Sequence, residues 1–260
     1  MPTQKRQDRI GLILKAVQET GGTTIRELAE ALDVSEMTVR RDLEVLASES
    51  RIRLVHAGAI PLEGRGEGLR AGVSLWSAGT AGSEEKMRIG KKAASLVEAG
   101  DVVIIDSGST TEWLARSLPP ELPVTILCFA LNILLASGRG PSRTVLCAGG
   151  ALDSDTLVFG SPEGLDLVRR YRAGKAFFSA GGVSERLGVT CVDPAEAELK
   201  KAAIASSQTR ILLADSRKFA TVKPAWFAEL SAFDAVITDS GIALEFVEIL
   251  REKGIALHVV

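Results

Sequence analysis

Hydrophobic residues in the first fifty positions repeat with the spacing of amphipathic helices. In three successive stretches, apolar residues recur at i, i+3 or i+4 and i+7, with polar residues between them. The predicted buried faces are Ile10, Ile13, Leu14 and Val17; Ile25, Leu28, Ala29 and Leu32; and Val39, Leu43 and Leu46. Thr24 and Glu27 have the spacing of a capping box before the second helix, and Ser35 is placed to cap the third. The pattern therefore predicts three short helices that share one core.

The third predicted helix carries a polar face opposite its apolar one. Met37, Arg41 and Glu44 lie on that face, flanked by Thr38 and Arg40. Arginine can contact phosphates, or bind a guanine edge through two hydrogen bonds. An ordinary surface helix would show the same amphipathicity, but the two helices before it favour the second helix of a helix-turn-helix, which enters the DNA major groove.

A predicted strand follows the third helix. Ile52 and Leu54 alternate with Arg51 and Arg53, which gives a strand with one basic face. Three helices followed by a basic hairpin describe a winged helix-turn-helix domain. The predicted DNA-contacting residues are Ser35, Met37, Thr38, Arg40, Arg41, Arg51, Arg53 and His56.

The charge balance of the chain is not that of a basic nucleic-acid-binding protein. Its formal net charge is -2, and residues 1–60 hold 9 Lys and Arg against 9 Asp and Glu. The positive residues are nevertheless clustered: Lys5, Arg6 and Arg9 at the start, and the arginines of the third helix and of the wing. The distribution, rather than the total, is what favours DNA binding.

From residue 84 onward, short apolar runs alternate with helical stretches. Residues 102–106 include the continuous apolar run of a strand buried on both faces of a parallel sheet. Further strands are predicted at 124–128, 144–148, 175–180, 210–215 and 234–238, and helices at 110–118, 130–137, 162–171, 194–206 and 243–253. This alternation predicts an α/β domain with helices on both faces of a mostly parallel sheet.

Glycine and charged residues dominate 61–68, between these two patterns. The Gly64-x-Gly66-x-Gly68 spacing resembles a dinucleotide-binding loop, but it follows no predicted strand and opens no helix, so that interpretation is excluded. With 260 residues the chain is long enough for two cores. The predicted organisation is a winged helix-turn-helix domain at 1–60, a linker at 61–83 and an effector-sensing and oligomerisation domain at 84–260.

Polar and glycine-rich segments follow several predicted strands, where ligands bind in such sheets. The loop from Asp106 to Thr111 leads into a helix and offers hydroxyls, N–H groups and the positive end of the helix dipole to an anion such as phosphate. The alternative is that Ser109 or Thr110 only caps the helix. The effector-binding residues predicted from these segments are Asp106, Ser107, Gly108, Ser109, Thr110, Thr111, Gly149, Gly150, Gly181, Gly182, Asp215 and Lys218.

Both halves resemble the DeoR family of bacterial transcriptional regulators. In the first half the resemblance is carried by Arg6, Ile10, Leu14, Ser35, the run Thr38-Val39-Arg40-Arg41-Asp42-Leu43 and the wing Arg53–Ala59; in the second, by Glu85-Lys86, the Asp106–Thr111 loop, Gly149-Gly150, Gly181-Gly182, Glu196–Lys200 and Asp215–Phe219. The resemblance implies a sensor domain similar in fold to ribose-5-phosphate isomerase and the CoA-transferases. It also implies a phosphorylated sugar or related metabolite as effector, and it adds Lys86 and Glu196 to the predicted effector-binding residues.

The sequence departs from the family pattern at two places. Cys128-Phe129 stands where family members often have Thr-Asn, and Gly174 stands where they often have Asp. Both family residues are polar groups that can bind sugar hydroxyls. Their absence predicts a more apolar effector pocket.

Cysteine and histidine content argues against metal and disulfide chemistry. Cys128, Cys147 and Cys191 are far apart in the sequence, and His56 and His258 are the only histidines. We expect core thiols in a reducing cytoplasm, no metal and no cofactor. No apolar run reaches transmembrane length, so no membrane association is expected.

Three functions remain open at this point. The first is a DNA-binding regulator that responds to a phosphorylated sugar, as a dimer or tetramer on a double-stranded operator; a repressor is favoured, and an activator would use the same parts. The second is a sugar-phosphate isomerase-like enzyme with a DNA-binding appendage, in which Asp106, Glu196, Asp215 and Lys218 supply acid and base groups. The third is DNA binding without an effector. We expect the first, and no enzymatic activity.

Overall fold

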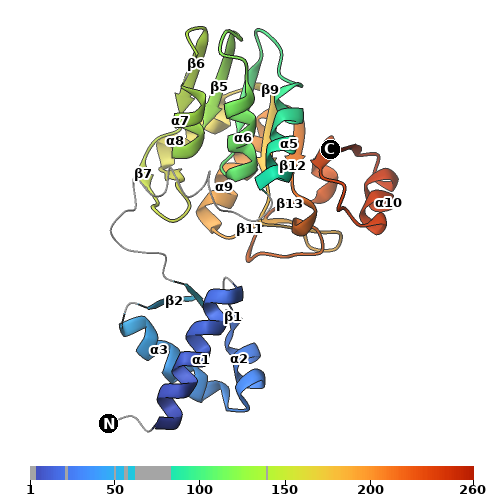
Figure 1. The fold of residues 1–260 in the computed structure, drawn as a ribbon. Helices are drawn as coiled ribbons and strands as arrows, with labels where there is room; N and C mark the ends of the chain where they lie inside the picture. The colour runs from blue at the N-terminus through green and yellow to red at the C-terminus, as the bar shows by residue number, and fades with distance from the viewer. Residues whose placement is uncertain (1–3, 21–22, 50, 56–57, 62–82, 139) are drawn as a thin grey trace. The chain divides into compact units, whose positions relative to one another are not determined.

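The computed structural model describes residues 4–20, 23–49, 51–55, 58–61, 83–138 and 140–260. The chain divides into two compact units, residues 1–68 and 69–260 (Figure 1), and each unit is described by itself. The predicted linker at 61–83 lies almost wholly outside the described residues.

The N-terminal unit contains three helices and a small antiparallel sheet. The helices are α1 (Gln4–Thr20), α2 (Ile25–Leu32) and α3 (Glu36–Ser48), and the sheet has the order β1 (Thr23–Thr24), β3 (Gly58–Pro61), β2 (Ile52–Val55). This is the winged helix-turn-helix arrangement that the sequence predicted.

The predicted apolar faces form the core of this unit. Ile13, Val17, Val39, Leu43 and Leu46 are each 0% exposed. The hydroxyl of Ser35 accepts a hydrogen bond from the Thr38 backbone N–H, which confirms the predicted N-cap of α3. Before α2, the carboxylate of Glu27 accepts a hydrogen bond from the Thr23 hydroxyl at 3.1 Å. The wing differs in one respect: β2 buries Ile52, but Leu54 is 43% exposed.

The C-terminal unit is built on a seven-stranded sheet with the order β15-β14-β12-β9-β4-β5-β6. Every pair of neighbouring strands in it is parallel. The strands are β4 (Val102–Ile105), β5 (Val124–Cys128), β6 (Arg143–Cys147), β9 (Ala173–Ser179), β12 (Ser207–Leu213), β14 (Ala235–Thr238) and β15 (Ala256–Val259). The predicted α/β class with a mostly parallel sheet is confirmed, because the central strands are the apolar runs that both faces of such a sheet require.

Six helices and two 3-10 turns are described around this sheet (Figure 1). They are α5 (Ser83–Ala94), α6 (Ser109–Ser117), α7 (Leu131–Ser137), α8 (Pro162–Arg170), α9 (Pro194–Ala205), α10 (Leu244–Glu252), η1 (Ser216–Lys218) and η2 (Leu230–Ala232). The helices α5, α6 and α7 pack side by side, and α8 packs on α9. Contact between α5 and α6 is close, since a Cβ on Gly90 would lie 2.5 Å from the Cβ of Trp113.

Several short strands were not predicted. They are the hairpin β7 (Ala151–Leu152) and β8 (Phe159–Gly160), the antiparallel sheet β10 (Gly182–Ser184), β11 (Gly188–Cys191), β13 (Ala225–Ala228), and the edge strand β15. The strands of the hairpin and of the small sheet have two to four residues and most contain glycine, so they lack the alternating or continuous apolar run that identifies a strand. The hairpin and β11 border the site described next.

Candidate nucleic-acid interface and ligand site

The polar face of α3 is open to solvent. Arg40 and Arg41 are exposed, Met37 is 59% exposed, and Thr38 is half-buried beside them. The side chains of Arg40 and Arg41 make no hydrogen bond or ion pair with any residue that the structure describes. Their guanidinium groups are therefore available to a partner.

The predicted wing residues are only partly described. Arg51 is exposed, with Nη1 3.9 Å from a carboxylate oxygen of Glu49. Arg53 lies in β2 opposite Ile60, but its side chain is outside the description. His56 lies outside the described residues altogether.

One charged residue of α3 turns inward, and the sequence did not predict this. Asp42 is 1% exposed and pairs with Arg6 and Arg9 of α1. These two arginines were predicted only as part of a basic cluster at the start of the chain. The Arg-Arg-Asp run identified Asp42 as part of a motif. It did not indicate that the side chain of Asp42 faces α1.

The predicted ligand-binding edge of the large sheet contains the point where the strand order reverses. Moving outward from the β4–β9 pair, β5 and β6 lie on one side and β12, β14 and β15 on the other. Ligands of open α/β sheets bind outside the carboxyl ends of the strands at such a point. Asp106 directly follows β4, and its Oδ2 accepts a hydrogen bond from the backbone N–H of Ser179 at the end of β9 at 2.8 Å.

A buried charged cluster occupies this position. Lys200 of α9 pairs with Asp106, and its Nζ lies 3.1 Å from Oε1 of Glu196. Ser107 donates a hydrogen bond to the same Glu196 oxygen at 2.6 Å. Lys200 and Asp106 are each 0% exposed. Lys200 was absent from the predicted site; its i, i+4 spacing from Glu196 was the signal that would have identified it.

The electrostatics keep this cluster ionised at Lys200 and Glu196. Burial acts to lower the pKa of Lys200, but Asp106 and Glu196 together raise that pKa above the ordinary value. Burial acts to raise the pKa of Glu196, and the ammonium of Lys200 outweighs it, so the pKa of Glu196 is lowered. Burial raises the pKa of Asp106 against the opposing charge of Lys200.

The loop before α6 is held in a conformation that only glycine allows. Gly108 has φ +119°, and a Cβ there would lie 2.7 Å from Oγ of Ser179. The Thr111 hydroxyl donates to the carbonyls of Ser107 and Gly108, both at 2.9 Å, and Asn132 of α7 donates to the Gly108 carbonyl at 3.2 Å. The loop is therefore fixed from inside the protein.

The hydroxyls of Ser109 and Thr110 make no hydrogen bond with any described residue. Gly108, the N-cap residue of α6, provides no side-chain cap. The alternative that Ser109 or Thr110 caps α6 is therefore wrong. The first turn of α6 keeps N–H groups and hydroxyls free for an anion.

Lys86 of α5 lies at the same edge. Helices α5 and α6 both run antiparallel to β4, because α5 leads into its amino end and α6 leaves its carboxyl end. The two helices touch at Gly90 and Trp113. Lys86 lies one turn before Gly90, and Ser109 lies one turn before Trp113. Both residues are therefore displaced from this contact toward the carboxyl end of β4. Lys86 is 7% exposed and makes no ion pair or hydrogen bond with any described residue. Burial lowers the pKa of this amine, with Asp215 opposing.

Asp215 and Lys218 belong to the neighbouring strand end. Asp215 is 1% exposed; its Oδ1 accepts a hydrogen bond from Nε of Arg217 at 2.9 Å, and its Oδ2 has no partner among the described atoms. Among described residues, no hydrogen bond or ion pair joins Lys86, Asp215 or Lys218 to the cluster of Asp106, Glu196 and Lys200. The prediction that these residues share one effector site stays a prediction.

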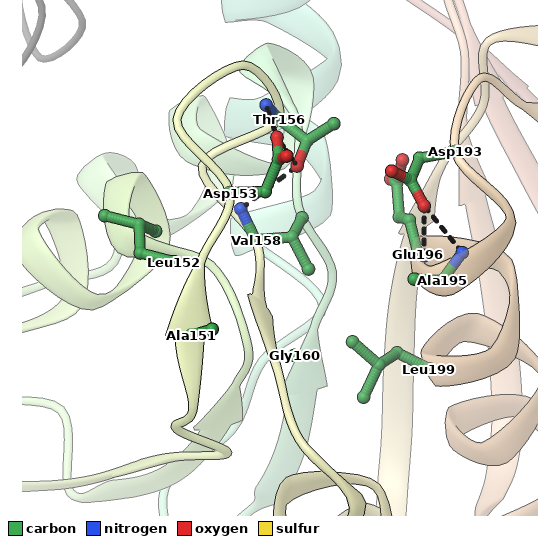
Figure 2. Close-up of a pocket in the computed structure, with 10 residues that line it drawn as sticks. All are labelled: Ala151, Leu152, Asp153, Thr156, Val158, Gly160, Asp193, Ala195, Glu196 and Leu199. Carbon is green, nitrogen blue, oxygen red and sulfur yellow. Dashed lines mark hydrogen bonds between the residues drawn. The ribbon is translucent and has the colours of Figure 1, made fainter.

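A pocket of about 320 Å³ opens beside Glu196. Figure 2 shows it between the β7–β8 hairpin and the start of α9, with Leu199 pointing from α9 toward the hairpin. Ala151, Leu152, Val158 and Leu199 give it apolar walls, and Asp153, Thr156, Asp193 and Glu196 supply oxygen atoms.

One glycine of each predicted ligand-approaching pair packs closely against another backbone segment. A Cβ on Gly150 would lie 2.4 Å from the Gly160 carbonyl, and one on Gly182 would lie 2.4 Å from the Thr221 carbonyl. Neither these glycines nor Gly149 and Gly181 line the pocket. At Gly150 and Gly182 the small size of glycine allows close contact between backbone segments, whereas a Cβ on Gly149 would meet nothing within 4 Å. The assignment of these glycines to an effector site stays a prediction.

The two departures from the family pattern have different outcomes. Gly174 lies at the amino end of β9, opposite the edge that carries Asp106, so its expected effect on the effector pocket is wrong. Phe129 is fully buried, and its carbonyl accepts a hydrogen bond from the Phe159 N–H at 2.8 Å. Phe129 therefore holds the β7–β8 hairpin through this backbone hydrogen bond and does not line the pocket.

Comparisons with known proteins match both units. A family model described as the DeoR-like helix-turn-helix domain matches residues 9–64, and one described as the DeoR C terminal sensor domain matches residues 82–240. The deoxyribose operon repressor of Escherichia coli K12 is 31% identical over 253 residues, covering 97% of this chain and 98% of that protein. The transcriptional regulator IolR of Bacillus subtilis is 28% identical over 92% of this chain and 93% of its own length. A ribose 5-phosphate isomerase A from Methanocaldococcus jannaschii superposes on 54% of this chain and 56% of its own, at 18% identity and a TM-score of 0.40.

The fold, the open arginine-bearing helix and these relatives define a DNA-binding transcriptional regulator with a sensor domain for a small effector. The chain belongs to the DeoR family. The named relatives are regulators rather than enzymes, which confirms the expectation that this chain is not an enzyme. None of the helices within the described ranges is long and apolar enough to cross a membrane.

Proposed function

We propose that this chain is a repressor of a carbohydrate operon and that a phosphorylated sugar releases it from its operator. The proposal rests on the edge of the sheet at the carboxyl ends of β4 and β9, which can bind an anion. The free first turn of α6 and the buried, unpaired Lys86 lie at this edge, together with the charged cluster around Lys200. Residues 1–60 would bind DNA, and 84–260 would sense the effector and hold the subunits together, in the cytoplasm.

The phosphate of the effector would bind at the first turn of α6. Ser109 and Thr110 supply free hydroxyls there, and Lys86 supplies a buried amine without a partner ion. A bound phosphate would provide that missing partner and raise the pKa of Lys86 back toward its ordinary range. Lys86 therefore favours an anion over a neutral sugar at this position.

The sugar would extend toward the pocket beside Glu196. The carboxylate of Glu196 lines that pocket and is held by Ser107 and Lys200, so it can accept a hydrogen bond from a sugar hydroxyl without moving. The apolar walls from Leu152 and Leu199 suit the carbon face of a small sugar.

The relatives favour the direction of regulation. One of them is a deoxyribose operon repressor, which makes a phosphorylated deoxyribose a first compound to try. A two-fold oligomer would place two α3 helices in successive major grooves, about 34 Å apart on a palindromic operator. Ser35, Met37, Thr38, Arg40 and Arg41 would meet the groove, and Arg51 would meet the flanking phosphates.

Thermal unfolding of the full chain tests the effector assignment. Deoxyribose 5-phosphate and ribose 5-phosphate are compared with unphosphorylated deoxyribose and with inorganic phosphate. At a concentration of 100 times Kd, an effector should stabilise the sensor by about 2.7 kcal/mol. Lys86→Met should lose the shift, whereas Lys91→Met, at an exposed lysine of the same helix, should keep it. Equal shifts in the two variants would remove Lys86 from the site, and no shift with any phosphorylated sugar would reject the effector class.

A further inference from the structure

Asp42 is a buried carboxylate on a helix whose neighbouring positions are exposed. It is 1% exposed, while Arg40 and Arg41 beside it are open to solvent. Its two oxygens accept hydrogen bonds from α1: Nε of Arg6 lies 3.0 Å from Oδ1, and Nε of Arg9 lies 2.7 Å from Oδ2. One carboxylate of α3 therefore fixes two guanidinium groups of α1.

This bonding uses one nitrogen of each guanidinium. The Nη atoms of Arg6 and Arg9 make no hydrogen bond with any residue that the structure describes. The two side chains are 37% and 22% exposed, so each arginine is open in part to solvent. Two positive charges meet one negative charge, which leaves one unit of positive charge on the cluster. Oriented free donors with excess positive charge favour an anion that accepts several hydrogen bonds.

The position of the cluster at the edge of the exposed face of α3 indicates which anion it would bind. Asp42 lies one helical turn after Thr38, so the α1 arginines border the Thr38 edge of α3. Arg41, one residue before Asp42, lies about 100° around the helix from Asp42, on the open face. When that face enters a major groove, a phosphate backbone runs along its edge.

We propose that Arg6 and Arg9, oriented by Asp42, clamp a phosphodiester of the DNA strand that borders the groove. The inference rests on the proposed placement of α3 in the major groove. Asp42 is the positioning residue, and the terminal nitrogens of the two arginines bind the phosphate. The clamp reads no bases, so it fixes the depth and angle of α3 for any operator sequence.

The salt dependence of DNA binding tests the clamp. Wild-type protein first selects a binding duplex from a random pool, and that labelled duplex is then titrated by fluorescence anisotropy at several salt concentrations. Each phosphate contact removed should reduce the slope of log K against log salt by about 0.9. Arg6→Ala and Arg9→Ala should each show that reduction, and Arg169→Ala, at an exposed arginine of the sensor unit, should not.

Lysine variants separate binding from packing. Arg6→Lys and Arg9→Lys keep a charge that can pair with Asp42, but lose the second edge of the guanidinium. The clamp predicts a reduced slope with an unchanged melting temperature. Asp42→Asn, which leaves one acceptor oxygen for two arginines, should lower the slope by less than the double variant Arg6→Ala with Arg9→Ala.

The outcomes are distinct. Lysine variants with the wild-type slope would overturn the clamp. If the alanine variants also had a lower melting temperature, Arg6 and Arg9 would have only a packing role. Failure of the wild-type chain to select any duplex would instead reject the DNA placement on which the clamp rests.

Discussion

Buried charges organise both units at the scale of single residues. Asp42 joins α1 to α3, and Lys200 joins α9 to the loop after β4 through Asp106. Charged side chains are rarely buried unless paired, so sequence patterns do not mark them as interior. Removing one partner of such a pair typically costs about 3–5 kcal/mol, because the other charge stays buried.

The cysteines show the same limit of sequence reasoning. Cys128 and Cys147 are far apart in the chain, but they are register partners on the parallel strands β5 and β6. Spacing along the sequence carries no information about which parallel strands become neighbours. The sequence predicted core thiols: Cys128 and Cys191 are buried, whereas Cys147 is half-buried.

This pairing predicts selective thiol chemistry at Cys147. A hydrogen bond with Cys128 lowers the pKa of Cys147 to about 7, against the opposing effect of burial, whereas burial raises the pKa of Cys191 to about 12. Because the thiolate is the reactive form, alkylation of Cys147 by iodoacetamide should increase through pH 7 and level off above it, while Cys191 reacts slowly throughout. Mass spectrometry of digests after timed alkylation measures both rates.

Cys128→Ala provides the control for that prediction. It removes the hydrogen-bond donor beside Cys147, so the pH midpoint for Cys147 should move up toward the ordinary thiol value of about 8.5. A midpoint already near 8.5 in the wild-type protein would contradict the proposed influence of Cys128.

At the scale of elements, the strongly periodic segments were predictable and the short ones were not. The helices α2, α3, α8 and α9 and the central strands carry caps or apolar runs that identify them. The β7–β8 hairpin and the β10-β11-β13 sheet depend on contacts distant in sequence, such as Gly182 against Thr221. The Asp106–Thr111 loop was predicted as a ligand site because it follows a buried strand. Helix α9, which pairs with it, was predicted only as a helix, without the role of Lys200.

The contact of α5 with α6 predicts opposite effects for two glycine substitutions. In Gly90→Ala the new methyl would lie 2.5 Å from Cβ of Trp113 and 2.7 Å from backbone atoms, so the helices must separate, at a cost of about 1–3 kcal/mol. In Gly11→Ala, on α1, the methyl meets nothing within 4 Å, and the gain in helix propensity should stabilise the N-terminal unit by about 0.5–1 kcal/mol. Urea unfolding followed by circular dichroism measures both changes.

Gly90→Ala should also weaken effector binding, because it displaces the helix that carries Lys86. Unaltered stability in this variant would show that α5 and α6 are less closely packed than the structure indicates. Destabilisation by Gly11→Ala would show that this position of α1 is not open.

At the scale of the whole molecule, the protein combines two units with separate cores. The sequence predicted this division from the change in hydrophobic period, and the two family models match the two units. Regulation by an effector requires that the effector favour one state of the protein over another, since a ligand shifts an equilibrium only by its difference in affinity for the two states. A coupling of about 1–3 kcal/mol changes operator affinity about 5–150-fold.

The measurement that tests the central claim most directly is operator affinity with and without a bound sugar phosphate. A labelled duplex selected by the wild-type chain is titrated at one fixed salt concentration, with the phosphorylated sugar that raises the melting temperature of the sensor. Arg41→Ala should weaken binding by about 1–3 kcal/mol in the absence of effector, because Arg41 is exposed on the face of α3 that we propose enters the groove. For the wild-type chain, we expect the effector to reduce affinity at least 5-fold. An operator affinity that stays the same while the sensor is saturated would contradict the account.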